Sequence, residues 1–399
     1  MAEKAARLFT PAMAVIALLL AVVPSLITGE WGIWFHRAIA VLILSDPIAL
    51  VFSLPLAYCN GIYAAAERGI FFKESDHLEK LSRVRSMVFE KTGIVTDARF
   101  IITDVHPVGM SEEKLLGIAG IAELCSRHPI ARAICTAGNI GSMSTDIVSE
   151  FEELPGQGVY ALIGGHTIYA GTGAFLSEHG VKYYVPSKPG TAVHVSMDGE
   201  YCGYILLADK VRSRAYDALE AIRSQGVEQL VMLTGDVKSS TRHIASSLNF
   251  DLARFELDAV GTSSAVKFLP NLDPGSVLAF VGSGADDAEA MEAADVGIAF
   301  YALANYDALK HGDILIMDDN IDSLPAAMRI AGSTSAAAVE NIIAFGAVQF
   351  ILLLLAIAGA AGLWTVIIAQ TLLFAGLTVN AKRTDMKKII PFGKGKKHK

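Results

Sequence analysis

Long stretches that are nearly free of charged residues lie near both ends of the chain. They cover 11–27, 38–58, 342–358 and 363–379. Each holds roughly 17 to 20 residues or more, the length that a helix needs to cross the hydrocarbon core of a bilayer. The pattern therefore predicts four membrane spans in two pairs.

These stretches also allow two other interpretations. Two basic residues precede the first one, as in a secretory signal peptide, but a second apolar stretch follows after a short turn at 29–32, so we expect a retained hairpin. The stretches could also be buried core helices of a soluble protein. Trp31, Trp34 and Trp364 lie near their ends, where membrane proteins place interfacial anchors, and favour the membrane.

Between the two pairs, short apolar runs end in polar loops that contain glycine. The runs cover 86–89, 230–233, 277–281, 295–299 and 313–317, with helical patterns over 215–224 and 239–248. Strand and helix patterns in alternation predict a βαβ series and a parallel sheet, whose ligands bind at its carboxyl edge. The loops after 86–89, 230–233 and 277–281 are expected to meet there in one site.

Residues 101–207 interrupt this series. Alternating patterns over 158–169 and 191–207 predict strands of a separate inserted domain, with linkers at its borders acting as a hinge. The predicted organisation is a first helix pair in 1–66, an α/β domain in 67–100 and 208–335, the insertion in 101–207, a second helix pair in 336–381 and a tail in 382–399.

Composition and charge agree with this organisation. The chain is 52% hydrophobic and only 19% charged, which is too apolar for an ordinary soluble enzyme. The tail is strongly basic, and Lys4 and Arg7 precede the first span, so both termini and the middle segment should face the cytoplasm of a multi-pass protein of the plasma membrane. The tail could also bind anionic lipid heads. No nucleic-acid partner is expected, and the four cysteines show no C-x-x-C spacing that would predict a zinc site.

Motifs follow three of the predicted strands. They are Glu90-Lys91-Thr92-Gly93-Ile94, Thr234-Gly235-Asp236 and Gly282-Ser283-Gly284-Ala285-Asp286-Asp287. A Lys-Thr-Gly after an apolar run is by itself also typical of an ordinary strand-to-loop turn. With the order and spacing of all three, nearly the whole chain resembles the later part of heavy-metal-transporting P-type ATPases, most closely the zinc/cadmium/lead type.

The resemblance implies a fold and a chemistry. The fold would be a HAD-like, Rossmann-type phosphorylation domain with an inserted α+β nucleotide-binding domain, and the cofactors would be ATP and Mg²⁺. In that family the Asp of Asp-Lys-Thr-Gly-Thr takes the γ-phosphoryl group of ATP. Catalytic-site positions carried over by the match are Lys91, Thr92, Thr234, Gly235, Asp236 and Asp287, the last also a Mg²⁺ ligand.

Several positions of that site depart from the family pattern. Glu90 replaces the nucleophilic Asp, and its extra methylene moves the attacking oxygen by about an ångström, which can cost roughly a hundredfold in rate. Ser283 stands where the family has a Mg²⁺-binding Asp, and losing that anion weakens the site. Asp286 replaces an Asn, and Thr262 aligns with a Lys that neutralises phosphoryl charge.

The insertion keeps the family's nucleotide-binding residues. They are Glu123, His128, Pro129, Gly156 and Gly158. The imidazole could stack on adenine or hydrogen-bond to it, the carboxylate could accept from the adenine amino group, and glycines let the backbone approach closely. A lone His-Pro would more simply be a helix start, and only the family context reverses that preference.

The membrane half also departs from the family. Asp46-Pro47-Ile48 stands where the family has Cys-Pro-Cys, and Pro47 and Pro55 should interrupt the helix and free carbonyl groups. Gln349 and Gln370 align with a membrane Lys and a membrane Asp. Without thiolates a soft-metal site is not expected, and Asp46 is a candidate ligand for a harder cation or a proton, unless it is solvated near the interface.

Three hypotheses follow. The first is a membrane-anchored pseudo-ATPase that binds nucleotide and regulates or supports a partner, such as a full-length P-type ATPase. The second is an active transporter subunit in which Glu90 is phosphorylated, completed by a separate polypeptide with an actuator domain, because the chain begins about where that domain ends in the family. The third, a decaying gene remnant, fits less well with intact spans and retained nucleotide residues.

Overall fold

The computed structural model describes residues 2–140, 143–154, 156–188, 190–236, 238–269, 275–283, 287–301 and 310–384. It contains two compact units. The first comprises 1–84, 273–277 and 312–399, and the second comprises 85–272 and 278–311.

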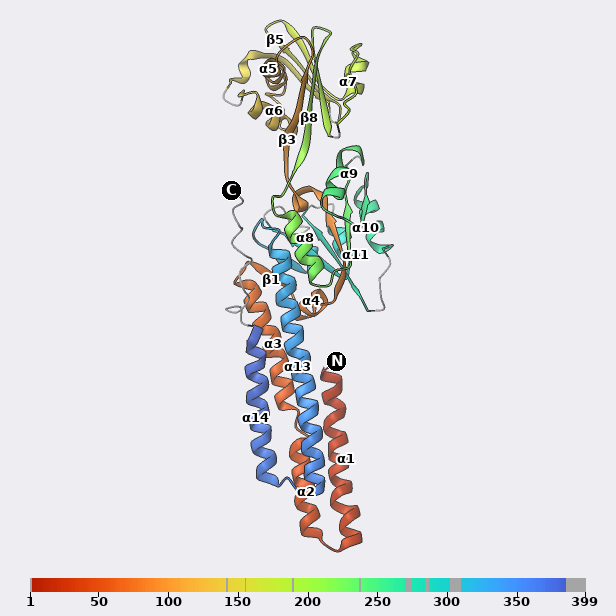
Figure 1. Ribbon diagram of the computed structural model, residues 1–399, viewed down its shortest axis with the longest axis vertical. Coiled ribbons are helices and arrows are strands. Elements are labelled where there is room, and N and C mark those ends of the chain that lie inside the picture. The colour runs from red at the N-terminus through yellow and green to blue at the C-terminus, as the bar shows by residue number, and fades with distance from the viewer. Residues whose placement is uncertain are drawn as a thin grey trace. The chain divides into compact units, whose positions relative to one another are not determined.

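The first unit is dominated by long apolar helices (Figure 1). They are α1 (Ala2–Thr28), α2 (Trp31–Leu44), α3 (Ile48–Ala66), α13 (Ser323–Ala358) and α14 (Leu363–Ala381). Among the described residues, four segments are long and apolar enough to cross a bilayer: 10–28, 31–66, 323–358 and 363–381. The prediction of four spans in two pairs is confirmed.

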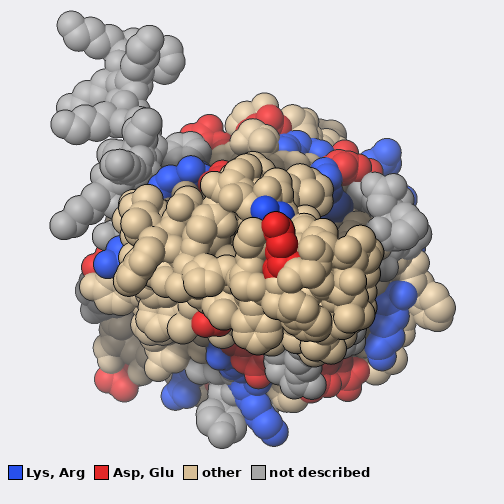
Figure 2. All heavy atoms as spheres, turned by 90° about the horizontal axis from the view of Figure 1, so that it is seen from below, with Lys and Arg blue, Asp and Glu red and all other residues tan. Residues whose placement is uncertain are grey.

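These helices pack through small and branched residues and leave large apolar side chains on the outside. Val41 and Leu44 of α2 are fully buried against Ala356 of α13 and Val366 of α14. Leu372, by contrast, is 68% exposed. Figure 2, seen from the end where α1 and α2 meet, shows a face almost free of charged side chains. The apolar side chains exposed along the sides of the helices, such as Leu372, are stable when lipid rather than water covers them.

The second span is broken at the position predicted from its proline. α2 ends at Leu44 and α3 begins at Ile48, where the backbone N–H donates to Oδ1 of Asp46 at 3.0 Å. Pro47 lacks the N–H that would continue the helix. The same prediction was wrong for Pro55, which lies inside an unbroken α3, because a helix can absorb one missing hydrogen bond when neighbouring helices pack against it.

Short elements complete the first unit. They are β1 (Ile70–Phe72), α4 (Ser75–Leu81), β13 (Ile314–Ile316) and the turn η4 (Lys382–Thr384). The sequence patterns did not predict β1, which pairs antiparallel with β13. The run at 313–317 was expected to join the parallel series, but its pairing with β1 is antiparallel.

A parallel sheet forms part of the second unit. Its strands, in spatial order, are β12 (Val296–Phe300), β11 (Val277–Gly282), β2 (Val84–Glu90), β9 (Gln229–Leu233) and β10 (Leu252–Arg254). The helices that alternate with them are α8 (Ala215–Ser224), α9 (Lys238–Ser247), α10 (Ala259–Lys267) and α11 (Ala288–Ala293). Pairing is parallel between β2 and β9, β9 and β10, and β11 and β12. The strands read as continuous apolar runs because helices cover such sheets on both faces, and the predicted α/β fold is confirmed.

A second, antiparallel sheet is inserted after β2. In spatial order its strands are β3 (Thr96–Pro107), β8 (Glu200–Val211), β7 (Thr191–Met197), β6 (His166–Gly171), β5 (Gly158–Ile163) and β4 (Val148–Leu154). Its helices are α5 (Glu112–Ala122), α6 (Pro129–Ala137), α7 (Gly173–Glu178) and the turn η2 (Thr145–Ile147). The core lies between the sheet and the buried faces of α5 and α6.

The chain enters and leaves this sheet on adjacent strands. Thr96 at the start of β3 is paired with Val211 at the end of β8. The sheet thus extends beyond the predicted range 101–207 at both ends, and a pair of strands stands where loop-like linkers were expected. The predicted domain boundaries remain predictions in other respects.

Candidate functional site

The carboxyl ends of β2, β9 and β11 carry the three motifs. Glu90 closes β2 and is paired with Leu233, so that Lys91 and Thr234 begin neighbouring loops. β11, the neighbour of β2 on its other side, ends at Gly282, directly before Ser283. The parallel arrangement places all three loops at one edge, as the βαβ pattern requires.

Glu90 lies between a hydroxyl and a second carboxyl group. Its Oε2 accepts a hydrogen bond from Oγ of Ser283 at 3.1 Å. The carboxyl of Asp287 accepts from the backbone N–H of Ser283 at 2.8 Å and also faces Glu90. Burial, and then the negative charge of Asp287, raise the pKa of Glu90 well above its usual range.

Gly282 makes room for this arrangement. A Cβ atom at that position would lie 2.6 Å from Oδ2 of Asp287, so only glycine lets the carboxyl group approach the strand end. The oxygen donors collected here come from Glu90, Ser283 and Asp287, and hard oxygen donors are those that Mg²⁺ prefers. The residues present fit a Mg²⁺ site, with a neutral hydroxyl where the family places a charged ligand.

Lys91 is held by two carboxylates, one from strand β8 and one from the loop after β9. Its side chain is 3% exposed and forms ion pairs with Asp209 and Asp236. The predicted closeness of Lys91 and Asp236 is observed. Asp209, which lies on β8, was not predicted.

Arg212 was also missed. It is buried, its guanidinium donates to the carbonyl of Gly93, and its backbone N–H donates to the carbonyl of Val95 at 3.0 Å. A signal for it was present in the sequence: an Asp and an Arg three residues apart directly follow the apolar run 205–208, where the chain returns from the insertion.

The remaining motif residues form the loop backbones. Thr234 is buried, and its Oγ1 accepts from the N–H of Asp236 at 3.1 Å. Gly93 has a φ of +81°, which favours glycine, and a Cβ on Gly235 would lie 3.1 Å from the carbonyl oxygen of Leu257. Thr92 is exposed at the mouth of the loop.

Two further positions depart from the family pattern, Thr262 and Asp286. Thr262 lies in α10, and its hydroxyl donates to the carbonyl of Asp258 one turn earlier at 3.0 Å, so the hydroxyl is used within its own helix. Asp286 lies outside the described residues.

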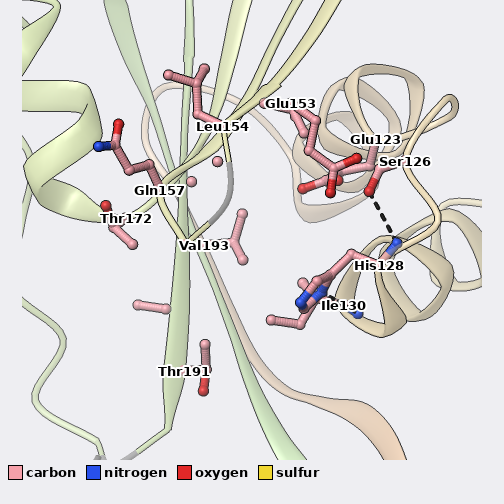
Figure 3. Close-up of a pocket in the computed structure, with 15 residues that line it drawn as sticks. Glu123, Ser126, His128, Ile130, Glu153, Leu154, Gln157, Thr172, Thr191 and Val193 are labelled. Atoms are coloured by element: carbon pink, nitrogen blue, oxygen red, sulfur yellow. Dashed lines mark hydrogen bonds between the residues drawn. The ribbon is translucent and has the colours of Figure 1, made fainter.

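A cavity of about 190 Å³ lies in the antiparallel sheet domain (Figure 3). Glu123, Ser126 and His128 line one side, and Gln157 and Thr172 line the other. The predicted nucleotide residues therefore surround one pocket, apart from Pro129, which begins α6 next to it.

His128 both caps a helix and faces the pocket. Its Nδ1 accepts from the N–H of Ile130 at 3.2 Å, and its own N–H donates to Oγ of Ser126 at 3.1 Å. Because Nδ1 accepts, the proton of the neutral ring sits on Nε2, which remains available as a donor. The helix-start interpretation and the binding interpretation are thus compatible.

Comparison with known proteins identifies the family. The model of the haloacid dehalogenase-like hydrolases matches residues 84–295. The chain belongs to this family.

Its relatives narrow the assignment within the haloacid dehalogenase-like hydrolases. The cadmium, zinc and cobalt-transporting ATPase of Bacillus subtilis is 35% identical over 96% of this chain and 55% of its own length. The zinc-transporting ATPase of Synechocystis is 34% identical over 95% of this chain and 53% of its own length. The chain spans about half the length of these curated relatives.

Solved structures agree. The crystal structure of a zinc-transporting PIB-type ATPase in the E2.Pi state has a TM-score of 0.82 and 30% identity, and the match covers 95% of this chain and 63% of that one. The catalytic domain CopB-B of a CPx-ATPase, at 23% identity and a TM-score of 0.55, shares the fold. This haloacid dehalogenase-like chain is a homologue of metal-transporting P-type ATPases.

Two membrane positions of this chain at which the sequence departs from the family pattern contact each other. Nε2 of Gln370 on α14 donates to Oε1 of Gln349 on α13 at 2.8 Å, so the two replaced positions meet. Oδ1 of Asp46 accepts from the N–H of Ile48, the first residue of α3. In the part of the chain that the structure describes, no group of three or more His, Cys, Asp or Glu side chains is placed to hold a metal ion.

Proposed function

We propose that this P-type ATPase homologue binds ATP in the pocket of its antiparallel sheet and acts as a membrane-anchored pseudo-ATPase that regulates or supports a partner. A full-length P-type ATPase is the partner class we infer. The single observation that carries the proposal is the contact of Glu90 with Ser283 and Asp287 at the site of phosphoryl transfer.

This contact is unfavourable for an attacking carboxylate. Glu90 carries one methylene more than an aspartate, which moves its attacking oxygen, and the hydroxyl of Ser283 donates a hydrogen bond to that carboxyl group. Bound Mg²⁺ would supply positive charge to the transferring phosphoryl group, and Ser283 offers that cation no negative charge. Phosphoryl transfer depends on positioning and charge stabilisation, and both are altered here.

The nucleotide pocket shows no comparable loss. His128 keeps a donor toward the cavity, and Glu123 and Gly156 line it. Retained nucleotide-binding residues beside an altered reaction centre support a protein that responds to nucleotide rather than one that hydrolyses it.

A second candidate is an active ATP-driven cation transporter subunit, completed by a separate polypeptide that carries an actuator domain. The ion pair of Lys91 with Asp236 favours it, because it holds together two of the positions that the family match places in the catalytic site. The curated relatives transport cadmium, zinc or cobalt. With the neutral Gln349–Gln370 contact and Asp46, we infer a harder cation or a proton as cargo in that case.

One experiment on the full-length protein in detergent tests both candidates. ATP binding is measured by calorimetry, and phosphoenzyme formation is measured by acid quenching after incubation with γ-labelled ATP and Mg²⁺. The natural protein is compared with Glu90→Asp, Glu90→Gln and the double variant Glu90→Asp, Ser283→Asp.

For a pseudo-ATPase we expect bound ATP and no label on the natural protein. Label on the natural protein that disappears in Glu90→Gln would establish the second candidate instead. Label that appears only in the double variant would show that the two replaced carboxylates caused the loss. Failure to bind ATP would contradict both candidates.

A further inference from the structure

Two carboxyl groups face the same part of the nucleotide pocket. Glu123 directly follows α5, and Glu153 lies on β4, about 30 residues later in the sequence, yet both line the cavity. Figure 3 shows their carboxyl groups pointing toward each other on the side of the pocket that also holds Ser126. The family resemblance implies a role for Glu123 and none for Glu153.

The two carboxyls differ in their contact with solvent. Glu123 is 6% exposed, whereas Glu153 is exposed. Neither carboxyl forms an ion pair or a side-chain hydrogen bond among the described residues. Burial, and then the charge of Glu153, raise the pKa of Glu123 to about 7.

Other titratable groups around Glu123 do not neutralise it. Cys135 of α6 donates its thiol to the carbonyl of Gly120, and burial together with Glu123 raises the pKa of that thiol. His128, at the start of α6, uses Nδ1 to accept the backbone N–H of Ile130. His194 of β7 bonds to the hydroxyl of Tyr201 at 2.8 Å, and burial lowers its pKa to about 4, so it is neutral near pH 7.

We propose that Glu123 recognises adenine as a neutral carboxylic acid, and that its burial in the pocket, together with the negative charge of Glu153, holds it in that form. A carboxylic acid offers one O–H donor and one carbonyl acceptor. The adenine edge offers the complementary pair, with N1 as acceptor and the N6 amino group as donor. An ionised carboxylate has acceptors only, so it pairs with the N1–H and N2 amino donors of guanine. Glu153 is thereby a specificity residue that acts through Glu123.

The proposal rests on ATP binding in this pocket and adds the reason for selecting the base. The sign of its pH dependence follows from the raised pKa: below about pH 7 Glu123 is mostly protonated and matches adenine, and above it the match is lost. In the described residues the structure provides no third ligand that would turn the two carboxyls into a metal site.

The test compares ATP with 1-deaza-ATP, which lacks the N1 acceptor, by calorimetry on the full-length protein. The ratio of the two dissociation constants cancels the ionisation of the triphosphate. The preference for ATP should fall by up to about tenfold between about pH 6 and about pH 8, because a group with a pKa near 7 passes from mostly protonated to mostly ionised.

Two variants locate the effect. Glu123→Gln should keep the preference for ATP at both pH values, since an amide offers the same donor and acceptor without titrating. Glu153→Gln, an exposed and nearly isosteric change, should move the fall in preference to lower pH. A pH-dependent preference that survives in Glu123→Gln, or equal affinities for ATP and 1-deaza-ATP in the natural protein, would overturn the inference. If neither nucleotide binds, the proposed function itself fails, and this inference with it.

Discussion

At the scale of residues, the glycine pair of the nucleotide pocket shows how one motif serves two physical purposes. Gly156 has a φ of +75° and open space where a Cβ would stand, on the wall of the cavity. Gly158 is paired with Gly171, and a Cβ there would lie 2.4 Å from the carbonyl oxygen of Ala170. The open space at Gly156 fits the expectation that this glycine admits the nucleotide. The close packing of two strands accounts for Gly158 instead.

Alanine substitutions should separate these purposes. Gly158→Ala should lower the local stability of β5 and β6 by about 3 kcal/mol, because a backbone oxygen blocks the new methyl group. Gly156→Ala should cost only about 1 kcal/mol from the left-handed backbone but weaken ATP binding. Hydrogen exchange of the two strands and calorimetry with ATP measure both effects. Equal losses of stability in the two variants would contradict this assignment.

At the scale of elements, the break between α2 and α3 gives Asp46 a structural task. An aspartate in a membrane span is a candidate for ion binding by default. In this structure its Oδ1 accepts the N–H of Ile48, one of the donors left open where a helix begins. The helix cap accounts for an acceptor at this position without any cargo.

Asparagine and alanine at position 46 distinguish the two roles. Asp46→Asn keeps the acceptor and should leave the thermal unfolding of the full-length protein in detergent nearly unchanged. Asp46→Ala removes it and should cost about 1 kcal/mol. Should Asp46→Asn be as unstable as Asp46→Ala, the negative charge rather than the cap would be the stabilising feature.

At the scale of the whole molecule, the even number of spans constrains topology. With four candidate spans, the segment between the pairs and both termini should lie on one side of the membrane, and the basic residues near the ends favour the cytoplasmic side. The turn between α1 and α2 should lie on the other side.

Cysteine labelling can check this topology. In a background whose natural cysteines are replaced by alanine, Gly29→Cys should react with an impermeant maleimide on intact cells. Gly109→Cys, in the loop after β3, should react only after lysis. Both glycines have positive φ and open surroundings, so they are a matched pair. Labelling of Gly109→Cys on intact cells would reverse the proposed orientation.

The sequence by itself determined the features that depend on neighbours along the chain. Four apolar stretches are long enough to be spans whatever they pack against, and buried parallel strands read as continuous apolar runs ending in polar loops. The order of three motifs after three strands was sufficient to predict that Glu90, Asp236 and Ser283 share one edge. The break at Pro47 followed from the missing N–H of proline.

Only the tertiary structure decided the features that depend on partners far away in sequence. The ion pair of Lys91 with Asp209 spans the whole insertion, and no local pattern specifies which acid a buried lysine meets. Pro55 stays within a helix because packing compensates for one lost hydrogen bond. Glu153 lies on a strand with other acidic residues, and the sequence does not distinguish it from them. Folding brings it close to Glu123, where its charge adds to burial in raising the pKa of Glu123.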